Sequence, residues 1–174
     1  MSLKNKLHFL CVCALIFFIS ACGASEPSSE PSSAPPAPFS RALWSSTLQD
    51  LRELEQTEYE TTASVYGGSS YIFPASYLDY SGKVKYMYDD RDQLVAIAFF
   101  YEGSDASQVK ELYDKIYPLA ARAFGESIHS ETAGHNSGEK WTRKEGNVLL
   151  SVLSTQEAHA LQYSFLHPSV SHSE

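Results

Sequence analysis

The sequence predicts an α+β domain in which two helices pack on one face of a mainly antiparallel sheet. Residues 41–57 and 109–123 each place apolar side chains at helical spacing. Shorter apolar or alternating segments of strand length follow each of these helices. The last of them, 160–166, alternates apolar residues with Gln162 and Ser164, a pattern typical of a sheet with one packed and one wet face. The predicted order is α-β-β-α-β-β-β.

The first helix is predicted over 41–57. Ser40 has the side chain of an N-cap, and Phe39 with Trp44 has the spacing of a hydrophobic staple. The tract that follows, 59–81, is rich in Tyr, Ser and Gly, and its pattern favours no particular element.

A hairpin is predicted next. Residues 83–88 alternate, the acidic stretch 89–92 reads as a polar turn, and 94–101 form an almost continuous apolar run. Because that run has few polar residues, we expect both faces of its strand to be covered.

The second helix is predicted to begin after Asp105 or Ser104 and to end at Gly125. Pro118 lacks a backbone N–H, so a kink is expected near the last two turns.

The C-terminal part is predicted to contain a mobile polar loop and three strands. The loop covers 126–139, and the strands cover 140–144, 148–154 and 160–166, with a turn at 145–147.

The N-terminus has the three zones of an export signal. Lys4 and Lys6 precede an apolar run at 9–19, which small residues follow. As a helix, this run would be about 16 Å long, roughly half the hydrocarbon thickness of a bilayer. Residues 1–21 are therefore predicted to be a cleaved signal and not a permanent membrane span.

The cleavage zone, Ile19-Ser20-Ala21-Cys22, resembles the lipobox of bacterial lipoproteins. The resemblance implies that Cys22 carries a diacylglyceryl group and becomes the first residue after cleavage, which anchors the protein to a membrane on its extracytoplasmic side. Gly23 and Ala24, and no Asp, directly follow Cys22, so outer-membrane transport is expected in a diderm host and cell-membrane attachment in a monoderm one. The alternative is an ordinary secretory signal that ends in a cysteine.

The chain is expected to hold one folded domain behind a spacer. Residues 22–38 are the lipidated cysteine and a disordered Ser/Pro-rich tether, which reaches up to about 50 Å at the polyproline rise. Residues 39–168 form the domain, and 169–174 form a disordered tail.

No catalytic constellation is present in the sequence, so an enzyme is not expected. All three cysteines lie at or before Cys22, which leaves the expected mature domain without thiol chemistry. His129, Glu131 and His135 share the polar loop, where solvated side chains are the preferred interpretation over a metal site. We predict no metal and no cofactor. The formal charge of −8 argues against binding to nucleic acid.

The Tyr-rich tract is the sequence feature most suggestive of binding. Tyr66, Tyr71, Tyr77 and Tyr80 lie among Ser and Gly, a composition typical of antibody paratopes. The alternative is that these rings cover the core.

Lipid anchoring and the lack of a catalytic constellation predict a non-enzymatic binding module for another envelope protein. A domain that binds a small molecule or glycan in a Tyr-rich pocket is the second hypothesis.

Overall fold

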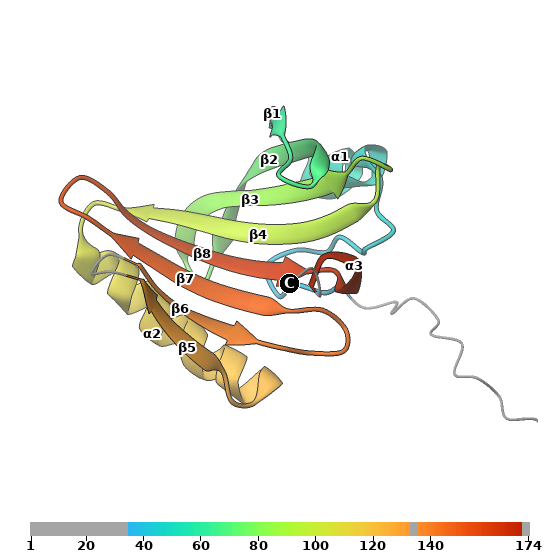
Figure 1. Cartoon of the computed structure of the whole chain (residues 1–174). Coiled ribbons are helices and arrows are strands. Elements are labelled where there is room, and N and C mark those ends of the chain that lie inside the picture. Colours follow the sequence, from blue (N-terminus) through green and yellow to red (C-terminus); the bar gives the residue numbers. More distant parts are fainter. Residues whose placement is uncertain (1–34, 133–135, 172–174) are drawn as a thin grey trace, which may run out of the picture. The chain divides into compact units, whose positions relative to one another are not determined.

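An eight-stranded antiparallel sheet organises the part of the chain that the computed structural model describes, residues 35–132 and 136–171 (Figure 1). The predicted signal, Cys22 and most of the tether lie outside the described residues. In chain order the elements are α1 (Leu48–Glu55), β1 (Glu60–Ala63), β2 (Gly67–Tyr77), β3 (Tyr80–Asp89), β4 (Leu94–Gly103), α2 (Ala106–Phe124), β5 (Ile128–Thr132), β6 (Asn136–Trp141), β7 (Val148–Ser154), β8 (His159–Leu166) and α3 (Pro168–Ser171).

The sheet is built from two similar halves. Its strand order is β1-β2-β3-β4-β8-β7-β6-β5, so each half is a four-strand meander preceded by a helix. The halves meet where β4 pairs antiparallel with β8. The predicted α+β class, with helices packed on a sheet, is confirmed.

One face of the sheet carries the main core and is called the helix face here. Its buried residues include Leu51 of α1 and Leu112 of α2, and α2 lies behind the strands in Figure 1. Along β8, Tyr163 points into this core while Gln162 and Ser164 point to the opposite, open face. The predicted alternation of side-chain direction is therefore confirmed, but the open face is less exposed than expected, since Ser164 is buried and Gln162 is half-buried.

Helix α2 begins and ends where it was predicted to. Asp105 is the N-cap, and its Oδ1 accepts hydrogen bonds from the backbone N–H groups of Ser107 (2.9 Å) and Gln108 (3.1 Å). The helix continues through Pro118 to Phe124, and Gly125 follows it with a positive φ of 85°.

The first helix is shorter than predicted. It begins at Leu48 because Thr47 and Asp50 form a capping box: the Thr47 N–H donates to Asp50 Oδ2 (2.7 Å), and the Asp50 N–H donates to Thr47 Oγ1 (3.3 Å). Ser40, the predicted N-cap, instead shares a 2.7 Å hydrogen bond with the buried hydroxyl of Tyr86. The prediction of a helix over 41–57 was therefore wrong in its first turns.

The unassigned tract 59–81 forms β1, β2 and the start of β3. In β2 the residues on the helix face are Tyr71, Phe73, Ala75 and Tyr77, while mostly polar or small residues alternate with them. Tyrosine and alanine stand at core-facing positions, so the hydrophobic alternation was weak in the sequence.

The predicted loop 126–139 is also a hairpin, made by β5 and β6. It lies at the edge of the sheet, where a strand has little core to cover. Among its described side chains only Glu139 and Trp141 are buried, so the segment can be mostly polar and still form strands. The strand predicted over 140–144 ends at Trp141. The order α-β-β-α-β-β-β thus lacked three strands, β1, β2 and β5, and the short α3.

Packing extends slightly beyond both expected ends of the domain. Ala37, two residues before the expected start, is 2% exposed. At the other end Ser171 is buried, and its Oγ and carbonyl oxygen accept hydrogen bonds from Asn147 N and Nδ2, both at 2.9 Å.

Two leucines of α2 test the assignment of the faces. Leu112 is fully buried and Leu119 is 49% exposed. We expect Leu112→Ala to lower the free energy of unfolding by about 2–5 kcal/mol, because it leaves a cavity in the core, and Leu119→Ala to change it by less than about 1 kcal/mol. Urea denaturation followed by circular dichroism measures both, and equal effects would contradict the packing described.

Candidate binding face

The open face carries a small apolar cluster of its own. Met87, Ala96 and Ala98 are buried there, and Tyr66, Phe100 and Leu166 pack against them. We call these six residues the open-face cluster. Tyr66 comes from the turn between β1 and β2, so a loop side chain covers part of this face.

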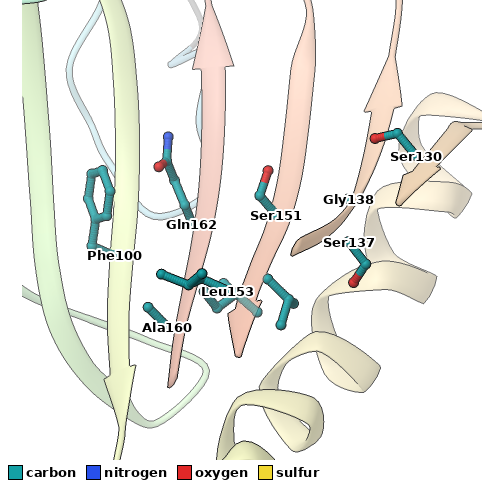
Figure 2. Close-up of a pocket in the computed structure, with 10 residues that line it drawn as sticks. Phe100, Ser130, Ser137, Gly138, Ser151, Leu153, Ala160 and Gln162 are labelled. Carbon is teal, nitrogen blue, oxygen red and sulfur yellow. The ribbon is translucent and has the colours of Figure 1, made fainter. Parts of the chain in front are cut away.

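A groove runs across the strands beside this cluster. Phe100, Gln162, Ser151, Gly138 and Ser130 are successive register partners on β4, β8, β7, β6 and β5, and Figure 2 shows them in one row. The row therefore spans roughly 19 Å at the usual spacing of strands. The groove has a volume of about 430 Å³.

The groove is uncharged but offers hydrogen-bonding groups. Each of its lining residues is neutral, and Ser130 and Ser151 are exposed. Gln162 donates from Nε2 to Ser164 Oγ (2.7 Å), which leaves its amide oxygen as an acceptor. Gly138 contributes no side chain to the floor of the groove. A Cβ at this position would lie 3.2 Å from the carbonyl oxygen of Leu150, which is a tight contact.

Exposed apolar side chains flank this region. Leu153, 38% exposed, lines the groove, and Ile128, 65% exposed, lies on β5 two residues from Ser130. Val65, 82% exposed, precedes Tyr66 in the β1–β2 turn. Exposed apolar residues beside a groove, as Leu153 and Ile128 are, are typical of an interaction surface.

The open face also lacks the acidic surplus of the chain. By register, its charged strand residues are Lys83, Lys85, Lys140, Glu60 and Glu102, with Lys83 and Glu60 paired at 3.2 Å. Since the formal charge of the whole chain is −8, most of the negative charge lies elsewhere. Asp89, at the end of β3, is left out of this set because its carboxylate is engaged locally: it accepts hydrogen bonds from backbone N–H groups of the following turn.

The four tyrosines singled out in the sequence do not form one surface. Tyr71, Tyr77 and Tyr80 lie on the helix face, and Tyr66 alone belongs to the open-face cluster. The ring centroid of Tyr77 lies 5.7 Å from that of Phe39, and burial raises the pKa of both Tyr66 and Tyr77 above the ordinary value. The alternative interpretation, that these rings cover the core, therefore describes Tyr71, Tyr77 and Tyr80.

Sequence reasoning did not find the groove residues as a group. The alternation in 160–166 predicted that Gln162 would be exposed, but it carried no information on its neighbours. Ser151, Gly138 and Ser130 become neighbours of Gln162 only through the pairing of β8, β7, β6 and β5. No spacing within one strand indicates that row.

A second polar cluster surrounds Glu139 on the helix face. Its carboxylate accepts hydrogen bonds from Tyr113 Oη (3.0 Å) and Ser127 Oγ (2.6 Å), and His129 Nδ1 lies 2.7 Å away. Burial alone would raise the pKa of Glu139, but these hydrogen bonds outweigh it and lower the pKa.

This arrangement differs from a nucleophilic triad. The Ser127 hydroxyl donates directly to the carboxylate, so His129 is not placed between them as a base. Of the predicted loop cluster, His135 lies outside the described residues. In the part of the chain that is described, no group of three His, Cys, Asp or Glu residues is arranged to hold a metal ion.

The chain matches no protein-family model, and it has no significant match among curated proteins or solved structures. None of the helices in residues 35–132 and 136–171 is both long and apolar enough to cross a bilayer.

The position of Tyr77 among core rings leads to a prediction. We expect Tyr77→Ala to lower the free energy of unfolding by about 3 kcal/mol, since it removes a ring from between Phe39, Phe99 and Tyr163. Thermal and urea denaturation measure this loss. Unchanged stability would show that Tyr77 is a surface residue, as the binding interpretation of the tract requires.

Proposed function

We propose that this protein is a non-enzymatic binding module, anchored to the extracytoplasmic side of a membrane through lipid on Cys22, and that the open face is its contact surface. The observation that carries the proposal is the uncharged groove, which meets the open-face cluster at Phe100. Groove and cluster together extend over β3, β4, β8, β7, β6 and β5 on a single face of the sheet.

Another envelope protein is the partner that this surface fits best. Leu153 and Ile128 expose apolar area at the groove, and Val65 exposes more in the turn that also carries Tyr66 of the open-face cluster. Exposed apolar area of this kind marks surfaces that protein partners cover. The open face carries three lysines beside two glutamates, so a neutral or weakly acidic partner would meet little repulsion there.

The anchor follows from the lipobox-like Ile19-Ser20-Ala21-Cys22 and from the tether that separates it from the domain. A tether of this length would let the open face meet a protein at some distance from the lipid. In a diderm host the absence of Asp directly after Cys22, where Gly23 and Ala24 stand, favours the outer membrane.

A glycan or other small neutral molecule is the second candidate. The groove combines the ring of Phe100 with serine hydroxyls and the Gln162 amide, which suits a ligand with hydroxyls and an apolar face. We therefore propose the groove for this second candidate, in place of a pocket lined by the Tyr-rich tract.

Filling the groove tests the proposal. A photo-crosslinking amino acid is placed at Leu153 in the full-length protein, and crosslinks are measured in native envelope with and without Ser151→Trp. We expect one specific protein adduct, reduced by about tenfold or more in the Trp variant because the new side chain occupies the groove. Thr62→Trp is the matched control, since Thr62 is exposed on the same face at the far edge strand β1.

Retention of the adduct in Ser151→Trp would place the contact outside the groove. Loss in both Trp variants would indicate a general disturbance of the face. A carbohydrate-bearing adduct in place of a protein one would favour the second candidate.

A further inference from the structure

We propose that the ionised carboxylate of Glu139 is a positioning group that holds the β5–β6 hairpin against α2 and thereby sets the shape of the outer half of the open-face groove. Its importance for binding rests on the function proposed above, but the positioning itself does not depend on any partner.

Glu139 connects four parts of the chain through its side chain. It lies on β6 and accepts hydrogen bonds from Tyr113 on α2 and Ser127 in the α2–β5 connection, and it pairs with His129 on β5. The side chain of Glu139 is 8% exposed, whereas that of His129 is 52% exposed. The carboxylate is thus the buried centre of the network and its donors lie around it.

The network and the groove use opposite faces of the same two strands. Gly138 and Ser130, which line the groove, are the sequence neighbours of Glu139 and His129. Because successive side chains of a strand point to opposite faces, any displacement of Glu139 on the helix face moves the groove wall with it.

Apart from the backbone pairing of β6 with β7, few described side chains of the hairpin are buried against the core. In β5, the side chains of Ile128, His129 and Ser130 are exposed. In β6 the buried side chains among the described ones are Glu139 and Trp141, and the Trp141 Nε1–H donates to the carbonyl oxygen of Gly125 (3.0 Å). Trp141 holds the end of β6 next to the β6–β7 connection, so Glu139 is the main buried contact further along the hairpin.

The charge of Glu139 determines how the network responds to pH. The groups that face it are Tyr113 from α2, Ser127 from the connection and His129 from β5, while its register neighbour on β7 is the apolar Leu150. The pKa of Glu139 is lowered in the fold. The stabilisation of the hairpin by the ionised carboxylate is therefore complete above the pKa of an unfolded Glu, about 4.3. It is lost as the pH falls through the lower pKa of Glu139 in the folded protein.

Hydrogen exchange of the full-length protein tests the proposal, read as protection factors for 128–141 and, separately, for β8. In Glu139→Gln we expect protection of the hairpin to fall by about tenfold or more at pH 7, because the amide cannot accept three hydrogen bonds, while β8 keeps its protection. In the unmodified protein the same fall should occur only at acid pH, and the variant should not show this pH dependence.

Two further variants complete the design. Tyr113→Phe removes one donor and keeps the ring that stacks on Tyr117, so a smaller fall confined to the hairpin is expected. Glu145→Gln is the matched control, since Glu145 pairs with Arg143 at 3.2 Å outside the network and should leave protection unchanged.

Hairpin protection in Glu139→Gln equal to that of the unmodified protein would overturn the proposal. An equal loss over β8 would also overturn it, because it would show that Glu139 supports the whole fold and not the hairpin. A confirmed hairpin effect with no change in crosslinking at Leu153 would leave the positioning role intact and count against the groove as the binding site.

Discussion

The pairing of β4 with β8 is the constraint on which the remaining structure depends. Eight residue pairs, from Ala96 with Leu166 to Gly103 with His159, join two meanders that have few other strand contacts with each other. This seam places Phe99 and Tyr163 side by side on the helix face, and it places Phe100 beside Gln162 on the open face. The core and the candidate groove are therefore both products of one register.

The two faces of this seam have different chemistry because the strands alternate. On the helix face, large apolar and aromatic side chains meet α1 and α2, and most of them are fully buried. On the open face the same strands present Ala96, Ala98 and Ser164, which are small enough to be covered by their neighbours without a helix above them. Small, neutral residues along this part of the open face allow a partner to approach the backbone closely, and this property supports the proposed role of the face.

Much of the fold could be predicted from the sequence where local signals were strong. The Asp105 cap, the apolar stripe of α2 and the alternation of β8 each identified an element, because each pattern lies within one segment. Strand β2 could not be identified because tyrosines occupy its core-facing positions. Strand β5 could not be identified because its partner β6 buries a glutamate, Glu139, where an apolar residue would be expected. The groove was out of reach for another reason: its residues come from five strands whose order no local pattern encodes.

The packing of Ala37 and Phe39 against the core has a mechanical consequence for a protein held by its N-terminus. In the proposed anchored form, tension along the tether reaches the domain at Phe39, whose ring lies 5.7–5.8 Å from the rings of Tyr77, Phe99, Tyr163 and Phe165. These rings belong to β2, β4 and β8, so both meanders share the load at their seam. A pull on the anchor would then be resisted by the centre of the sheet, and the exposed edge strands β1 and β5 would not be peeled away first.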